Sequence, residues 1–141
     1  MEAQNQNMIT VACTVNAPVE IVWEYFTNPD HIIGWYFASD DWHAPRAEND
    51  IRTGGKFLTR MEAKDGSFGF DFEGIYSEVL PNSLIHYGLA DGRQVIIKFT
   101  ETDEQTTVTE SFDPENQNPA EMQQAGWQMI LDNFKKYTES N

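Results

Sequence analysis

One acidic residue stands out among the groups that could carry chemistry. The segment TVTESF alternates in polarity, so Glu110 shares one face of a predicted strand with Val108 and Phe112. If that apolar pair faces inward, the carboxyl is buried and must be ion-paired, hydrogen-bonded or neutral. Arg60 or Lys98 could pair with it, or it could act as the general base of a cyclase or a hydrolase. The alternative is a β-bulge that turns Glu110 to solvent.

Other reactive side chains give weaker signals. His31, His43 and His86 lie far apart without metal-ligand spacing, so we predict no metal site and no cofactor. His86 falls on an expected strand and stays a candidate proton donor. Cys13 is the only cysteine and lies in an alternating run, which favours a buried, unreactive thiol in a reducing compartment. Nucleotide-binding glycine motifs and nucleophile motifs do not occur.

The stretch Ile32–Gly55 concentrates aromatic and acidic side chains. It holds Trp35, Tyr36, Phe37 and Trp42, and it fits neither a helical nor a strand period. We therefore predict irregular chain here, with its aromatic surface available to a ligand or a partner protein.

Composition limits the class of protein. The chain has 141 residues and a net charge of −14, with a pI of about 4.3. One domain is expected, and nucleic acid and anionic membranes are poor partners for such an acidic chain. No signal peptide and no membrane-spanning run is apparent, which predicts a cytoplasmic protein, either monomer or homodimer. We expect residues 1–7 to be a flexible N-terminus and residues 8–141 to form the domain.

The basic residues cluster unevenly along the chain. Five of the nine, Arg46, Arg52, Lys56, Arg60 and Lys64, fall within nineteen residues. One interpretation is an exposed pair of strands with alternating charges. The other is a basic ridge that docks an acidic partner.

Periodicity predicts the order of the elements. A strand at 8–18 precedes a helix of about nine residues that starts at Pro18 and ends at Asn28-Pro29, and a short helical turn follows. Further strands are expected at 56–63, 68–79, 84–90, 93–101 and 105–112, with hairpin turns at two Asp-Gly pairs. A long helix at 118–137 closes the chain, with an apolar stripe of Met122, Ala125, Met129, Ile130, Phe134 and Tyr137, widened by Trp127 and Leu131.

Four segments form an ordered set of motifs, namely APVEIVWEYFTNPDHIIGW, Gly54-Gly55, FEGIYSEVLPNSLIHY and GWQMILDNFKKY. This set resembles the helix-grip (START-like, SRPBCC) superfamily. Within that superfamily, the chain is similar to homologues of the activator of the heat-shock protein 90 ATPase. The resemblance covers nearly the whole chain. We expect a lone domain, which departs from the eukaryotic co-chaperones because they have an additional N-terminal domain.

The resemblance implies an α+β helix-grip fold. In this fold a curved antiparallel sheet wraps around the long C-terminal helix, two short helices follow the first strand, and a cavity lies between sheet and helix. Trp35, Phe37 and Trp42 would then form a lid or mouth. The remaining expected ligand-binding residues are Met61, Phe70, Phe72, Tyr76, His86, Glu110, Phe112, Met122, Trp127 and Ile130.

Three functions stay open. The first is a binding protein, with little or no enzymatic activity, for a small apolar or aromatic ligand, which buried aromatic and methionine side chains would suit. The second is a co-chaperone-like interaction domain that docks through residues 46–64, with a chaperone as its partner. The third is a cyclase or hydrolase that uses Glu110.

Overall fold

The protein is described here by a computed structural model of residues 8–141. The flexible segment expected at residues 1–7 lies outside the described residues. The elements are β1 (Ile9–Val15), α2 (Val19–Thr27), α3 (Pro29–Ile32), β2 (Trp42–Asn49), β3 (Lys56–Ala63), β4 (Gly69–Leu80), β5 (Leu84–Gly88), β6 (Gln94–Thr102), β7 (Gln105–Phe112) and α4 (Ala120–Ser140).

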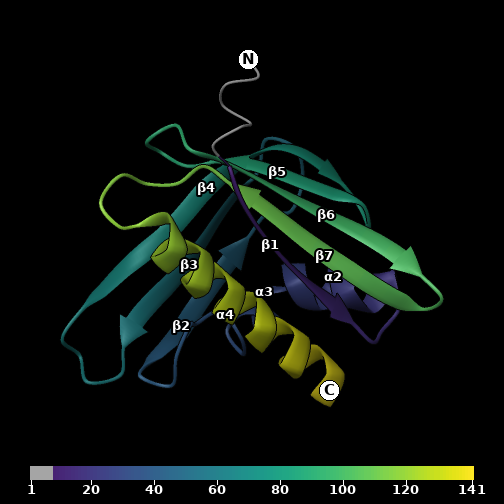
Figure 1. The fold of residues 1–141 in the computed structure, drawn as a ribbon, viewed down its shortest axis with the longest axis horizontal. Coiled ribbons are helices and arrows are strands. Elements are labelled where there is room, and N and C mark those ends of the chain that lie inside the picture. Colours follow the sequence, from purple (N-terminus) through teal and green to yellow (C-terminus); the bar gives the residue numbers. More distant parts are fainter. Residues whose placement is uncertain (1–7) are drawn as a thin grey trace.

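Seven strands form one curved antiparallel sheet, and α4 crosses its concave side (Figure 1). The strand order is β1-β7-β6-β5-β4-β3-β2, so every pair except β1–β7 joins consecutive strands through a short connection. The glycines of both Asp-Gly pairs adopt positive φ, 79° at Gly66 and 93° at Gly92, as these tight turns require. The predicted α+β helix-grip fold is confirmed.

Strand β2 corrects the prediction of irregular chain between Ile32 and Gly55. Residues Trp42–Asn49 pair with β3, and the register shifts between His43 and Arg46. Pro45 lies inside that shift. Because β2 is at the edge of the sheet, the N–H that proline lacks is not needed for pairing with a further strand. The bulge breaks the period-two pattern, and the sequence pattern therefore hides the strand.

The buried face of α4 also differs from the predicted stripe. Met122 and Met129 are 59 % and 47 % exposed, whereas Gln123 and Leu131 are buried. The face that packs on the sheet includes Trp127, Leu131 and Phe134 of the predicted stripe but not the two methionines. It is formed by Gln123, Trp127, Leu131, Phe134 and Thr138, spaced three and four residues apart.

Helix α2 begins one residue later than predicted, with Pro18 as its N-cap. Pro18 offers no side-chain acceptor, and Glu101 of β6 instead accepts a hydrogen bond from the first helical N–H, that of Val19, at 3.2 Å. Val19 and Val22 are buried, while Ile21 between them is 43 % exposed.

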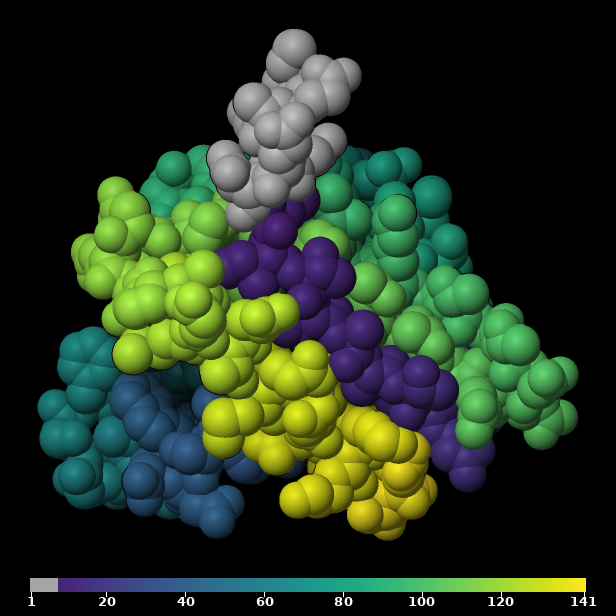
Figure 2. Space-filling model, in the orientation of Figure 1, coloured from purple at the N-terminus to yellow at the C-terminus, as the bar shows by residue number. Residues whose placement is uncertain are grey.

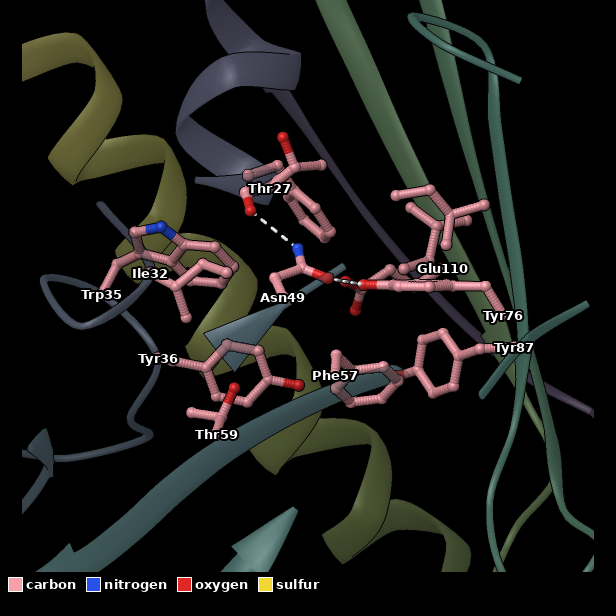
Figure 3. A pocket seen from close by; sticks show the side chains of 13 residues that line it. Thr27, Ile32, Trp35, Tyr36, Asn49, Phe57, Thr59, Tyr76, Tyr87 and Glu110 are labelled. Carbon is pink, nitrogen blue, oxygen red and sulfur yellow. Dashed lines mark hydrogen bonds between the residues drawn. The ribbon is translucent and has the colours of Figure 1, made fainter. Parts of the chain in front are cut away.

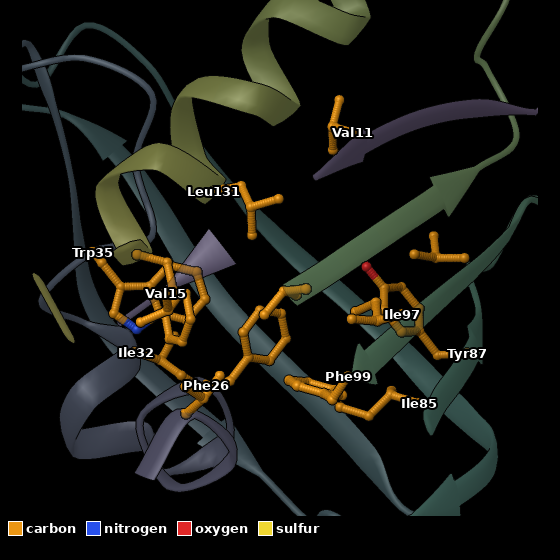
Figure 4. Packing of buried hydrophobic residues seen from close by; sticks show 14 of the residues in the cluster. Val11, Val15, Phe26, Ile32, Trp35, Ile85, Tyr87, Ile97, Phe99 and Leu131 are labelled. Carbon is orange, nitrogen blue, oxygen red and sulfur yellow. The ribbon is translucent and has the colours of Figure 1, made fainter. Parts of the chain in front are cut away.

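Aromatic packing joins the helices to the sheet. The ring of Phe26 on α2 lies 5.2 Å from Trp35, 5.4 Å from Phe99 on β6 and 5.1 Å from Phe134 on α4. Trp35 is fully buried and donates its indole N–H to the Tyr25 carbonyl at 3.1 Å. Figure 4 shows these rings between α4 and the inward side chains of the sheet.

Side chains of α4 cover the free edge of β1. The Gln128 amide accepts a hydrogen bond from the Ala12 N–H at 3.4 Å and donates one to the Ala12 carbonyl at 2.9 Å. Gln124 donates to the Thr10 carbonyl at 3.3 Å. The helix therefore satisfies main-chain groups that a neighbouring strand would otherwise meet.

Two glycines give opposite predictions about stability. A Cβ at Gly126, inside α4, would meet no atom within 4 Å, so Gly126→Ala should raise stability by about 0.5–1 kcal/mol through helix propensity. A Cβ at Gly74 would lie 2.7 Å from the Gly88 carbonyl oxygen, so Gly74→Ala should lower stability by about 1–3 kcal/mol. Urea unfolding measures both changes, and equal signs would contradict this packing.

Candidate functional site

A small cavity lies in the core between the sheet and the short helices. Its volume is about 40 Å³, enough for a few atoms or a water molecule. The residues that line it are Phe26, Thr27, Ile32, Trp35, Tyr36, Asn49, Phe57, Thr59, Tyr76, Ile85, Tyr87, Ile97 and Glu110. Large side chains of the chain itself thus fill most of the space between sheet and helices (Figure 3).

Asn49 fixes one wall of this inner cavity. Its side-chain amide donates to the Thr27 carbonyl at 2.7 Å and accepts a hydrogen bond from the Tyr76 hydroxyl at 2.6 Å. These two bonds tie the end of β2 to α2 and to β4 (Figure 3). The Tyr76 hydroxyl is therefore engaged within the wall.

A larger groove opens beside the inner cavity, between the start of α4 and strands β3 and β4. Its volume is about 290 Å³, close to the lower limit of about 300 Å³ typical of ligand sites. Figure 2 shows the surface hollowed between the yellow-green start of α4 and the blue and teal strands. The groove is lined by Tyr36, Met61, Phe70, Phe72, Arg93, Glu110, Glu115, Gln123, Trp127 and Ile130.

Tyr36 and Glu110 line both spaces and so mark the boundary between them. Strand β7 runs in unbroken register against β1 and β6, so no bulge turns Glu110 outward, and the side chain is 8 % exposed. The solvent-facing alternative is therefore wrong. Pairing with Arg60 is also wrong, because that guanidinium binds Glu62 and Asp71.

Lys98 does not pair with Glu110 either. It lies opposite Thr109 on the neighbouring strand and is exposed on the other face of the sheet. Within residues 8–141 the Glu110 carboxyl has no ion-pair or hydrogen-bond partner. Desolvation raises its pKa from 4.5 to about 8, so the group is mostly neutral at pH 7 and can donate a hydrogen bond.

Two further hydroxyls face this carboxyl. Burial raises the pKa of Tyr36 and of Tyr87 well above their ordinary values, and the nearby Glu110 raises both further. Contact with the Tyr87 hydroxyl offsets part of the shift at Tyr36. Both phenols thus stay protonated through the working range of pH, and the site holds neutral donors.

The structure brings eight of the thirteen residues expected from the sequence to these two spaces. Trp35 and Tyr76 line the inner cavity, Glu110 lines both spaces, and the outer groove takes Met61, Phe70, Phe72, Trp127 and Ile130. Trp35 forms a buried wall of the inner cavity and is not part of an exposed mouth.

The other five lie elsewhere. Phe112 is buried behind the groove and stacks on Trp127 at 3.8 Å, while Met122 points to solvent. Trp42 packs against Phe68 and Phe70 beside a separate depression, Phe37 lies half-buried outside both spaces, and His86 is hydrogen-bonded to Gln94 at 3.0 Å.

Sequence reasoning missed several lining residues. Tyr36 was part of the aromatic stretch but was not selected, and Phe57 and Thr59 lie on the alternating face of β3 that also carries Met61. Their shared period-two spacing with Met61 could have identified them. Asn49 had no such signal, because its role depends on the unpredicted strand β2.

The structure also bears on the basic cluster and on the question of a metal site. Arg46 pairs with Glu48 at 3.0 Å, Arg52 with Asp50 at 2.9 Å, and Arg60 with its two acidic neighbours. Three of the five basic residues of this cluster are therefore ion-paired with neighbouring acids of the chain. Among the described residues, no group of three or more His, Cys, Asp or Glu could hold a metal ion, and no helix is long and apolar enough to cross a membrane.

The Glu110 pKa leads to a prediction about stability. Its folded-state pKa of about 8 exceeds the ordinary 4.5, so the native state binds an extra proton between these values. Stability should fall as pH rises through that window, by up to about 1.4 kcal/mol per pH unit from this group. Glu110→Gln should remove this contribution and be more stable than wild type above pH 8.

Urea unfolding across this range measures the difference between wild type and Glu110→Gln. Glu73→Gln, at an exposed position of β4, is the matched control and should track the wild type. A constant difference between Glu110→Gln and wild type at all pH values would contradict the raised pKa.

Solved structures resemble the chain closely. A protein of Cytophaga hutchinsonii is 55 % identical, with a TM-score of 0.83 over 96 % of this chain and 94 % of that one. An AHSA1-like protein of Aeromonas hydrophila is 40 % identical, with a TM-score of 0.85 over 94 % of this chain and 93 % of its own. A protein of Chromobacterium violaceum shares the fold at 22 % identity, with a TM-score of 0.84 over 96 % of this chain and 99 % of its own.

A comparison with curated proteins found no match. The family model described as "Activator of Hsp90 ATPase homolog 1-like protein" matches residues 16–139, which is most of the chain and includes both spaces of the site. With the helix-grip architecture and these relatives, the match shows that the chain belongs to this family of the SRPBCC superfamily.

Proposed function

We propose that this protein binds a small apolar or aromatic molecule in the groove between α4 and strands β3 and β4. The observation that carries the proposal is the convergence of apolar walls on one buried, mostly neutral carboxyl group. Ligand sites commonly combine a concave apolar lining with a few polar groups that fix orientation. The domain that we propose for this role spans residues 8–141.

Aromatic side chains and a methionine line the groove. Phe72 on β4 and Trp127 on α4 meet edge to face with ring centroids 6.4 Å apart, and both border the groove. Met61 on β3 adds a flexible, polarisable side chain to the lining. Burial of apolar ligand surface at about 25 cal/mol per Å² would supply affinity, and aromatic stacking would add to it.

A catalytic role for Glu110 would be that of a general acid and not that of the general base considered from the sequence. A carboxyl with a pKa of about 8 is mostly protonated at neutral pH and is better suited to a general acid than to a general base. We therefore rank a cyclase or hydrolase activity below ligand binding as a candidate function.

A co-chaperone-like role draws support from the family name, which refers to activation of the Hsp90 ATPase. Its proposed docking surface at residues 46–64 has less support, because Arg46, Arg52 and Arg60 are already paired with acids of this chain. Addition of the protein to a purified chaperone of that class tests this role, and an unchanged ATP turnover would count against it.

The first experiment is purification under native conditions, followed by denaturation and mass spectrometry of released small molecules. A stoichiometric apolar or aromatic compound would support the proposal and identify the ligand class. An empty protein that also shows no thermal shift with a broad set of flat apolar compounds would overturn it.

A pair of substitutions on β4 tests the location of the site. Phe70 lines the groove and is 39 % exposed, so Phe70→Ala should weaken binding of fluorene, a flat hydrocarbon, about tenfold without unfolding the domain. Ile75 is 52 % exposed on the opposite face of the same strand, and Ile75→Ala should leave binding unchanged. Titrations followed by amide NMR shifts measure both affinities, and equal losses in the two variants would place the site elsewhere.

A further inference from the structure

Three hydrogen-bond donors from separate parts of the chain meet at the boundary between the groove and the inner cavity. Glu110 comes from the middle of β7, Tyr87 from β5 and Tyr36 from the segment after α3. All three line the inner cavity, and Figure 3 shows their side chains pointing into the same space. Glu110 and Tyr36 also reach the outer groove.

The fold leaves part of this donor set free. The Tyr76 hydroxyl is bonded to Asn49, whereas Glu110 has no such partner within residues 8–141. Tyr36 and Tyr87 are bonded to each other, so one of the two phenols donates to the other and the second keeps its proton for the cavity. A buried polar group without a partner destabilises a fold by its desolvation cost. A ligand atom that forms the missing hydrogen bond recovers this free energy as binding affinity.

Building on the proposed groove function, we infer that the ligand carries a carbonyl or enol oxygen at one end. That oxygen accepts hydrogen bonds from Glu110 and from one hydroxyl of the Tyr36–Tyr87 pair at the inner cavity, while the flat apolar body lies in the groove. The inner cavity, at about 40 Å³, has room for a few atoms but not for an aromatic ring, so the oxygen end of the ligand enters it and the rings stay in the groove.

Neutral donors favour such an oxygen over other groups. A protonated carboxyl beside phenol hydroxyls can stabilise partial negative charge on an oxygen atom, because the apolar surroundings strengthen each hydrogen bond. A carboxylate ligand would have to lose its own hydration among neutral groups. A cationic ligand would find no ionised partner at the inner cavity at neutral pH.

Recognition should depend on pH through Glu110. The other ionisable groups around it are Cys13 on β1, Tyr36, Tyr76, Tyr87 and, at the groove, Arg93 and Glu115. Burial raises the pKa of Cys13 to about 12, and it raises the pKa of each of the three tyrosines above the ordinary range. Arg93 is held by Asp91 at 2.8 Å, and the Glu115 carboxylate binds Asn118, which keeps the pKa of Glu115 low.

Of these groups, Glu110 alone changes charge near pH 8. Above that value it becomes a carboxylate, which repels a ligand oxygen. The affinity for an oxygen-bearing ligand should therefore fall, while that for a plain hydrocarbon should change little.

Fluorenone and fluorene form a matched pair of probes, since both are flat three-ring molecules and only fluorenone has a carbonyl. Below the Glu110 pKa, wild type should bind fluorenone about tenfold tighter than fluorene, as one net hydrogen bond predicts. Measurements about 1.5 pH units below and above that pKa should show this preference and its loss. The infrared carbonyl stretch of bound fluorenone should shift to lower frequency than in hydrocarbon solvent.

Variants separate recognition from folding. Glu110→Gln keeps an N–H donor without a titratable proton, so the carbonyl preference should persist at both pH values. Glu110→Leu should abolish the preference and leave fluorene binding intact, and Tyr36→Phe or Tyr87→Phe should each reduce it. If the leucine variant does not fold, the other three variants still decide the question.

The outcomes distinguish the two proposals. Equal affinity for the two probes, or an unshifted carbonyl stretch, overturns the oxygen-recognition inference and leaves groove binding standing. Binding of neither probe, together with an empty natively purified protein, overturns the groove function and this inference with it.

Discussion

A single long helix has to cover the concave face of seven strands, and this constraint underlies the whole structure. Helix α4 lies along β1, where its glutamines bond to the strand. It therefore cannot also cover β3 and β4, which lie toward the other end of the strand order (Figure 1). The uncovered part is filled by aromatic side chains such as Tyr36, Phe57 and Phe72, and what they leave open is the groove.

The burial of Glu110 follows from the same arrangement. An antiparallel strand alternates strictly, so the register that buries Val108 and Phe112 also buries Glu110 between them. Within residues 8–141 the carboxyl has no counter-ion, and burial holds its proton. A more stable chain would have an apolar residue at this position, because replacing an unpartnered buried polar group usually stabilises a fold. This conflict between local stability and the residue present is typical of functional sites.

Much of the fold could be predicted because its signals are local. The Asp-Gly turns, the period of β3 and the Pro29 that ends α2 each depend on a few neighbouring residues. Strand β2 was hidden because Pro45 and its bulge break the period, and only the pairing with β3 defines it. The buried face of α4 was predicted wrongly at Met122 and Met129, because hydropathy does not reveal which side a helix presents to a sheet.

The site was predictable in its residue types but not in its shape. Inward-facing aromatics were identified from alternation, yet whether Trp35 closes a mouth or fills the core depends on its packing against Phe26 and against Phe134, which lies far away in the chain. Likewise, the protonation state of Glu110 depends on which groups surround it in the fold, and the sequence pattern does not reveal these neighbours. Packing, and not composition, sets the size of the inner cavity.

The glutamines that cover β1 have a consequence for how molecules of this protein meet. Sheet edges with free N–H and C=O groups invite strands from other molecules and so promote fibres or swapped dimers. Here Gln128 and Gln124 occupy one edge, and the bulge at Pro45 interrupts the other. Strand pairing between copies is therefore hindered at these positions of both edges, and the strong negative charge of the chain opposes the close approach of two copies.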